Sequence, residues 1–254
     1  MKTNVPSFIK RSYPLRVSDF DRHQRVLPSS VLDLFQEIAG VHADMLGISG
    51  PQLLEKNLCW MVTRSRFEIL KQPALYKSVI VKTWPIESHR IELDRDYEVY
   101  SEDGELLIRG TSAWVVMDIS DRSSPKLVMA RDFDLGLGEY LTERTFERAW
   151  GRAVYNKIAC ESPYEYTPAY TDLDMNGHVN NVKYASFALN AVEKMLGDRQ
   201  ITDVRIDFSK EILRGETVRI YSEAKKNEDG ALIISARGET DASPMNFGVI
   251  FTAK

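Results

Sequence analysis

Apolar side chains recur at helical spacing in two stretches of the chain. The first stretch covers residues 31–45 and the second covers residues 184–196. Side chains three and four positions apart share one face of a helix. Each stretch therefore predicts a long amphipathic helix with one buried face.

Polar residues mark the expected ends of these helices. Ser29 or Ser30 is the expected N-cap of the first helix, and Asn180 or Asn181 that of the second. Their side-chain oxygens can accept hydrogen bonds from the unpaired backbone N–H groups of a first helical turn. Gly197 is expected to end the second helix.

Four strand-like runs follow each predicted helix. They cover residues 60–70, 78–84, 91–100 and 106–117 in the first half, and 202–208, 217–224, 231–238 and 246–252 in the second. Residues 102–104 and 228–230 both read Glu-Asp-Gly, a signal for a hairpin turn. Each half thus predicts a strand, a helix and an antiparallel meander.

A short motif occurs twice and indicates an internal duplication. Residues 17–26 resemble residues 170–179: both contain Ser or Thr, Asp, an apolar residue and Asp, then four variable residues and Val. The offset is 172 − 19 = 153, between Asp19 and Asp172. Self-similarity of this kind predicts that each half forms the same structural unit.

The duplication and the order of elements together predict the fold. A long helix followed by four strands buries most apolar surface when the sheet wraps around the helix. We therefore expect an α+β fold, a tandem (double) hotdog in which the two copies pair side by side like a hotdog dimer. The expected domains are an N-terminal half (1–130), a connector with a short helix near residues 143–150 (131–160), and a C-terminal half (161–254).

Composition narrows the class of protein. With 254 residues, 43% of them hydrophobic, and a net charge of −4, the chain is long enough for a sizeable core and is not a basic nucleic-acid binder. Neither a signal peptide nor a run of about 18 apolar residues is evident, so no membrane span is expected. Two cysteines, Cys59 and Cys160, fit a protein of the reducing cytoplasm.

Common catalytic and metal-binding motifs are absent from the sequence. Residues 47–51 lack the final glycine of a nucleophile elbow, and residues 136–141 do not complete a dinucleotide-binding fingerprint. The four histidines show no metal-ligand spacing. We therefore expect no metal and no cofactor.

Residues 172–184 carry the most specific motif, Asp-Leu-Asp-Met-Asn-Gly-His-Val-Asn-Asn-Val-Lys-Tyr. This stretch resembles the D-x-N-x-H and V-N-N-x-x-Y signature of the acyl-[acyl carrier protein] thioesterases of plants and bacteria. The resemblance extends to residues 60–66, 81–85, 95–100 and 110–114 of the first half. It implies a hydrolase of fatty-acyl thioesters whose first half binds the acyl chain.

The resemblance also implies a catalytic set. It matches Asp174, Asn176 and His178 in the motif and places a glutamate at Glu211. Plant members have a cysteine after that glutamate, whereas this chain has Ile212. The resemblance therefore favours hydrolysis by an activated water over a thiol nucleophile.

Each of these residues has a chemical role and a plainer alternative. Glu211 is the expected general base, although a lone strand-end glutamate is more commonly just solvated. His178 would orient the water or polarise the thioester carbonyl, or it would only be a helix-entry residue bonded to a neighbouring turn. Asn176 would hold the water or the carbonyl, or it would only be a turn residue next to Gly177. Asp174 would orient Asn176 or His178, or it would only cap the turn. Backbone N–H groups at the following helix start would stabilise an oxyanion.

The first copy of the motif has different chemistry. Asp21, His23 and Arg25 occupy the positions of Asp174, Asn176 and His178. Gln72 aligns with Glu211 at an offset of 139 and has no basic carboxylate. We expect that the first half has lost its own hydrolytic site and that each chain has one active site, between the halves, with the acyl chain entering the first.

The expected partner is acyl carrier protein bearing a fatty-acyl phosphopantetheine. Because that protein is acidic, a basic docking face is expected. The candidates are Lys225, Lys226, Arg214, Arg219 and Arg237. Two alternatives stay open, an acyl-coenzyme A thioesterase and a non-catalytic acyl-thioester sensor, and the chain is expected to be a monomer or a homodimer.

Overall fold

The computed structural model describes residues 5–87, 91–147, 151–153, 155, 158, 162–175 and 177–254. The chain forms two compact units. Unit 1 comprises Met1–Asp19, Asp33–Ser65 and Leu70–Ala149, and unit 2 comprises Phe20–Leu32, Arg66–Ile69 and Trp150–Lys254. Two short pieces of the first copy therefore belong to unit 2: residues 20–32, which include most of the motif loop and the start of the first helix, and residues 66–69 at the end of one strand.

Unit 1 is built on an antiparallel sheet with strand order β1-β3-β4-β5-β2, and β6 pairs with β5. The strands are β1 (Ile9–Pro14), β2 (Leu58–Ile69), β3 (Ser78–Pro85), β4 (Leu93–Ser101), β5 (Leu106–Asp118) and β6 (Lys126–Val128). A 3-10 turn, η1 (Val17–Asp19), and the helices α1 (Pro28–Met45) and α2 (Gly50–Leu54) complete this part of the chain. All four predicted strands are present.

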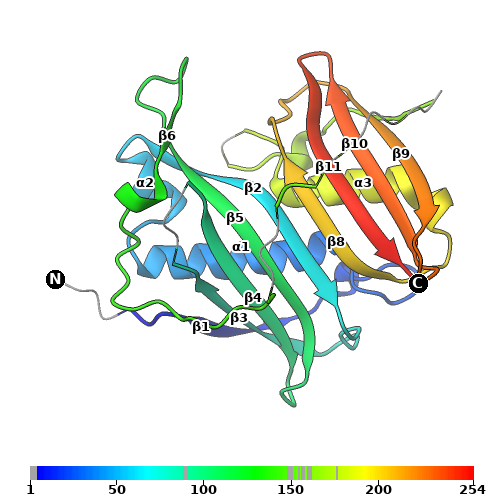
Figure 1. Cartoon of the computed structure of the whole chain (residues 1–254), viewed down its shortest axis with the longest axis horizontal. Coiled ribbons are helices and arrows are strands. Elements are labelled where there is room, and N and C mark those ends of the chain that lie inside the picture. The colour runs from blue at the N-terminus through cyan, green and yellow to red at the C-terminus, as the bar shows by residue number, and fades with distance from the viewer. Residues whose placement is uncertain are drawn as a thin grey trace. The chain divides into compact units, whose positions relative to one another are not determined.

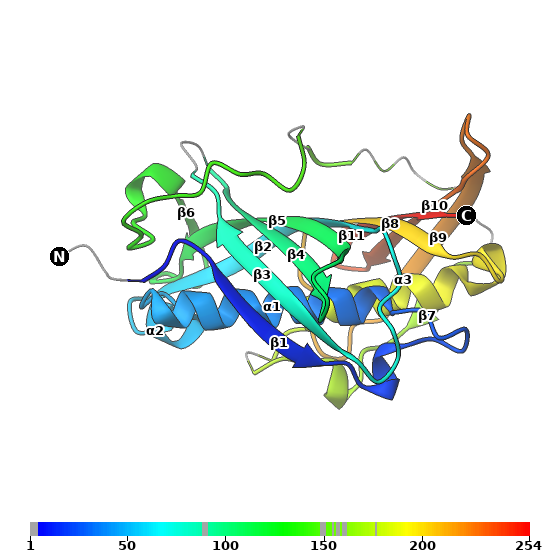
Figure 2. The same cartoon turned by 90° about the horizontal axis from the view of Figure 1, so that it is seen from below.

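Helix α1 lies across one face of this sheet (Figures 1 and 2). Its Phe35 ring stacks on Tyr97 of β4, with ring centroids 4.2 Å apart. The helix begins at Pro28, so Ser29 and Ser30 lie in its first turn, and their predicted role as N-caps is wrong. Proline suits this position because the first turn has no acceptor for its missing N–H group.

Unit 2 repeats the architecture with strand order β8-β11-β10-β9-β7. Its elements are β7 (Tyr164–Tyr166), the 3-10 turn η3 (Tyr170–Asp172), α3 (Asn181–Leu196), β8 (Ile201–Phe208), β9 (Val218–Lys226), β10 (Leu232–Thr240) and β11 (Ser243–Ala253). Helix α3 packs against β9, β10 and β11, and Figure 2 shows it beneath these strands. Its predicted ends are confirmed: Asn180 caps the start and Gly197 follows the last turn.

The described part of the connector lacks the helix predicted near residues 143–150. Residues 143 and 144 have no regular structure, residues 145–147 form bends, and residues 148–150 lie outside the described ranges. Buried carboxylates hold this segment instead. Asp96 of β4 accepts a hydrogen bond from the backbone N–H of Thr145 at 2.8 Å, and Asp207 of β8 accepts one from the Tyr155 hydroxyl at 2.8 Å. A short 3-10 turn, η2 (Ala130–Asp132), precedes this part.

The duplication is visible in the hydrogen bonds of the two motif loops. Asp19 and Asp172 are both buried, and each accepts the backbone N–H of the residue three positions earlier. Isolated bridges join Phe20 to Val26 and Leu173 to Val179. All these pairs keep the offset of 153, which confirms the repeat.

The hydrogen bonds at the strand ends also repeat between the two copies, at the offset of 139 predicted for Gln72 and Glu211. The Leu107 carbonyl accepts the N–H groups of Leu70 and Lys71, and the Asn246 carbonyl accepts those of Ser209 and Lys210. Each pair of positions differs by 139, which supports the alignment of Gln72 with Glu211.

None of the helices in the described ranges is both long and apolar enough to cross a bilayer.

Candidate active site

A tight turn presents His178 at the start of α3. The Asp174 N–H donates to the His178 carbonyl at 2.8 Å, and the Gly177 N–H donates to the Asp174 carbonyl at 3.1 Å. Gly177 has φ +80°, a left-handed conformation in which glycine avoids the steric cost of a Cβ. Asn176, the remaining predicted site residue of this turn, lies outside the described residues.

The side chain of Asp174 caps the turn with a hydrogen bond. Its Oδ1 accepts the backbone N–H of His178 at 3.1 Å. The carboxylate therefore stabilises the turn that carries His178, which supports the plainer of its two predicted roles. Its expected effect on the imidazole tautomer stays a prediction.

The buried Asp172 ties the turn to its neighbours. Its carboxylate accepts the Tyr166 hydroxyl at 2.6 Å and lies 3.6 Å from Lys183 Nζ. Burial alone would raise the pKa of Asp172, yet the hydrogen bonds from Tyr166 and the Ala169 backbone, with Lys183, hold that pKa below its usual value. The ionised carboxylate thus braces the start of α3.

The segment after β8 brings Glu211 to His178. His178 forms an isolated antiparallel bridge with Leu213, and the Val179 N–H reaches the Ile212 carbonyl at 3.4 Å. His178 Nδ1 lies 3.1 Å from Glu211 Oε2. The two side chains are 47% and 44% exposed, so the pair is open to a water molecule and a substrate.

The chemistry of His178 and Glu211 allows the two side chains to act as an acid/base pair. When Nδ1 carries the proton, it donates to the Glu211 carboxylate and leaves Nε2 as an acceptor. The carboxylate keeps further lone pairs for the proton of an incoming water. In the first turn of α3, the Val182 N–H donates to the Asn180 side chain at 3.2 Å and the Lys183 N–H donates to the Asn180 carbonyl at 2.9 Å. The stabilisation of an oxyanion by this helix start therefore stays a prediction, which rests on the partial positive charge of the helix N-terminus.

Two side chains that the sequence analysis did not assign to the site contact the Glu211 segment. The Tyr184 hydroxyl accepts the Ile212 N–H at 3.0 Å, and Asn246 Nδ2 donates to the Glu211 carbonyl at 3.1 Å. Tyr184 fits the apolar stripe of its helix, and Asn246 lies at the start of a predicted strand. Tyr184 is also the last residue of the V-N-N-x-x-Y motif, whereas only a comparison of the two copies could have singled out Asn246.

The first copy of the turn contacts the end of α3. Its backbone has the same hydrogen bonds, and Gln24 at φ +58° takes the place of Gly177. His23 Nε2 lies 3.1 Å from Asp198, and Arg25 donates to the Arg199 carbonyl at 2.9 Å. These side chains thus bind protein groups within unit 2.

No group of three or more His, Cys, Asp or Glu residues within the described ranges could hold a metal ion. Two residues considered for such chemistry, His89 and Cys160, lie outside those ranges. Cys59 is half-buried. Ile212 is fully buried.

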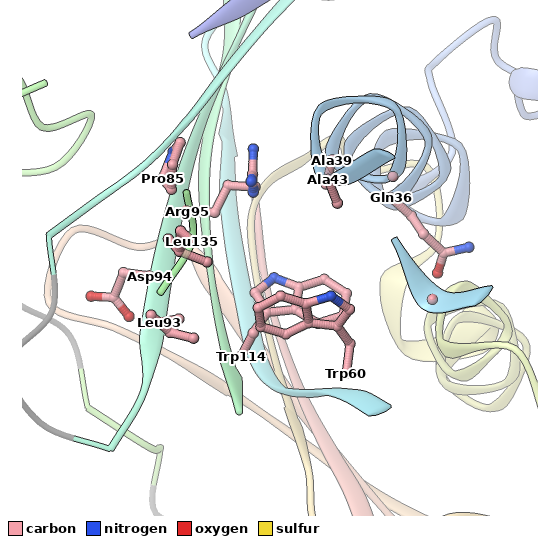
Figure 3. A pocket seen from close by; sticks show the side chains of 12 residues that line it. Gln36, Ala39, Ala43, Trp60, Pro85, Leu93, Asp94, Arg95, Trp114 and Leu135 are labelled. Atoms are coloured by element: carbon pink, nitrogen blue, oxygen red, sulfur yellow. The ribbon is translucent and has the colours of Figure 1, made fainter. Parts of the chain in front are cut away.

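Unit 1 contains an apolar cavity of about 150 Å³. Figure 3 shows the indoles of Trp60 and Trp114 beside each other, with Ala39 and Ala43 of α1 across the cavity. The two rings meet edge to face with centroids 6.4 Å apart. A flexible apolar chain is the kind of group that such a lining accommodates.

The candidate docking residues divide into two groups. Arg219 forms an ion pair with Asp241 at 2.7 Å, and Arg237 pairs with Glu239. Arg214, Lys225 and Lys226 are exposed. The exposed group is therefore better placed to meet an acidic partner.

Comparison with known proteins covers most of the chain. Residues 6–129 match the family model described as acyl-ACP thioesterase N-terminal domain, and residues 155–246 match the C-terminal domain model. The chain is 26% identical to a chloroplastic oleoyl-acyl carrier protein thioesterase of Coriandrum sativum, over 92% of this chain and 68% of the relative. It is also 26% identical to a chloroplastic acyl-[acyl-carrier-protein] hydrolase of Cuphea viscosissima, over 95% and 63% respectively. The chain thus spans about two thirds of the length of these relatives.

A solved structure shares the whole architecture. The 12:0-ACP thioesterase from Umbellularia californica superposes with a TM-score of 0.81 over 97% of this chain and 94% of that one. At 19% identity this likeness bears on the fold. It confirms the predicted α+β tandem hotdog.

Proposed function

The chain belongs to the acyl-acyl carrier protein thioesterase family, and we propose that it hydrolyses fatty-acyl thioesters of acyl carrier protein to free fatty acid and carrier protein. The observation that carries the catalytic part of this proposal is the contact of His178 with Glu211 at 3.1 Å. A cytoplasmic location remains the prediction from the sequence.

The proposed reaction begins with a water molecule beside Glu211. As the water oxygen attacks the thioester carbonyl carbon, Glu211 accepts the water proton, and the carbonyl oxygen becomes an oxyanion. His178 holds the carboxylate in place and stabilises its negative charge, and the partial positive charge at the N-terminus of α3 stabilises the oxyanion. Asn176 is proposed to hold the water or the carbonyl.

Collapse of the tetrahedral intermediate completes the reaction. The carbon–sulfur bond breaks, and the departing phosphopantetheine sulfur takes up the proton that Glu211 received. The products are the fatty acid and the carrier protein with its free thiol. Neither a metal ion nor a covalent cysteine intermediate is needed, in keeping with isoleucine at position 212.

The remaining parts of the substrate have proposed places as well. The acyl chain is proposed to occupy the cavity of unit 1, whose lining includes Trp60 and Trp114. The acidic carrier protein is proposed to dock on the exposed cations Arg214, Lys225 and Lys226. Charge complementarity of this kind would favour the carrier protein over coenzyme A as the acyl donor.

Replacing the proposed base tests the function. Glu211→Gln keeps the size of the side chain and removes its basicity, so kcat on acyl-carrier substrates should fall by about 10² or more. Glu165→Gln, at an exposed position on β7 of the same unit, is the matched control and should keep kcat unchanged. Near-normal turnover by a folded Glu211→Gln protein would refute the assignment.

A further inference from the structure

Two buried polar side chains contact the backbone on both sides of Glu211. Tyr184 Oη accepts the N–H of the following residue, Ile212, at 3.0 Å. Asn246 Nδ2 donates to the Glu211 carbonyl at 3.1 Å and to the preceding Lys210 carbonyl at 3.4 Å. The exposed fractions of Tyr184 and Asn246 are only 3% and 1%.

The first copy has apolar residues at both positions. Val31 corresponds to Tyr184 (184 − 153 = 31), and Leu107 corresponds to Asn246 (246 − 139 = 107). Both are buried, and the Leu107 carbonyl accepts the same two backbone hydrogen bonds as that of Asn246. The shared fold therefore needs only apolar side chains at these two positions.

Burying polar groups there has a cost that the fold alone does not require. A buried polar atom without a hydrogen bond destabilises a protein by about 1–3 kcal/mol. Asn246 Oδ1 is buried and has no hydrogen-bond partner among the described residues. Any contribution of the Asn246 side-chain amide that offsets this cost must therefore come from its Nδ2, which donates to the carbonyls of Lys210 and Glu211.

The Glu211 segment needs such support because it lies beyond the end of β8. Residues 209–212 are not part of any strand, and the Glu211 side chain is 44% exposed. Backbone hydrogen bonds hold the neighbouring Lys210 and Ile212, but close packing does not fix the direction of the exposed Glu211 carboxylate. A catalytic group misplaced by about 1 Å can cost about 10²-fold in rate.

We propose that Tyr184 and Asn246 are positioning residues that clamp the backbone of residues 210–212 and so keep the Glu211 carboxylate on His178. This inference rests on the proposed function, because it concerns the same carboxylate. Burial raises the pKa of Tyr184 to about 12, so its hydroxyl stays neutral and can serve the clamp throughout the usual assay range.

The test uses the full chain with Tyr184→Phe, which removes one oxygen, and Asn246→Leu, which introduces the residue of the other copy. With an acyl-acyl carrier protein as substrate, each should lower kcat by about tenfold or more with little change in KM. In a Glu211→Gln background neither change should lower the residual kcat further. Tyr13→Phe is the control: its buried hydroxyl has no partner among the described residues, and its loss should leave kcat unchanged.

The outcomes separate the clamp from the catalytic assignment. Wild-type kcat in Tyr184→Phe and Asn246→Leu, with Glu211→Gln inactive, would overturn the clamp and leave the proposed function standing. Equal losses with and without Glu211 would show a merely structural role and also overturn the clamp. An active Glu211→Gln protein would overturn both. If Asn246→Leu does not fold, Tyr184→Phe decides the matter by itself.

Discussion

At the scale of single residues, His42 links the stability of unit 1 to pH. Its Nδ1 lies 3.1 Å from the guanidinium of the buried Arg95, and its Nε2 lies 3.0 Å from the Pro6 carbonyl. Because a guanidinium only donates, Nδ1 must accept and Nε2 must carry the proton. Burial, and then the charge of Arg95, lowers the pKa of His42 to about 4.

A histidine whose pKa is lower in the folded than in the unfolded chain stabilises the fold above its unfolded pKa of 6.5. Stability should therefore fall as the pH drops from 6.5 towards 4, and His42 should account for about 3 kcal/mol of that loss. His42→Gln can still accept from Arg95 and donate to Pro6, but it does not titrate. Denaturant unfolding at pH 7 and pH 4.5 should show a smaller loss for this variant; an equal loss would contradict the prediction.

At the scale of elements, the two motif turns have the same backbone and different chemistry. His23 pairs with the exposed Asp198 at the end of α3, whereas His178 contacts Glu211. His178→Ala should therefore lower kcat by about 10². His23→Ala removes exposed contacts with Asp198 and Arg22, worth at most about 1 kcal/mol of stability, and should lower kcat far less. Similar losses of kcat in both variants would mean that the first turn also takes part in hydrolysis.

Most elements of the fold could be predicted because their signals are local. Apolar spacing located both long helices and eight strands, and the repeated motif located the turn of His178. The start of α1 was misplaced because proline at position 28 outweighs the capping serines as a start signal. The hydrogen bonds of Tyr184 and Asn246 to the Glu211 segment join residues 28 and 35 positions apart. No local pattern shows such pairings.

At the scale of the whole molecule, the acyl chain is proposed to occupy the cavity of unit 1, so the half without the proposed base should set substrate preference. Ala43 of α1 lines this cavity. Ala43→Leu should fill part of the space and lower turnover of long acyl substrates relative to short ones by about tenfold or more. A panel of acyl-carrier substrates of graded length measures this shift.

The matched control for that change is Glu37→Leu, which adds the same side chain at an exposed position of α1. It should leave the order of preference among acyl lengths unchanged. An unchanged order in Ala43→Leu as well would show that the cavity does not hold the acyl chain.

The duplication described above also has an evolutionary consequence. In an assembly of identical chains, every mutation appears in every copy, so a residue that helps one site and harms another cannot be kept for one alone. Two copies within one polypeptide mutate independently. The buried asparagine at position 246 and the buried leucine at position 107 are such a difference between the copies. Under the proposed function, covalent linkage would let one copy specialise in chemistry while the other adapts to the shape of the substrate.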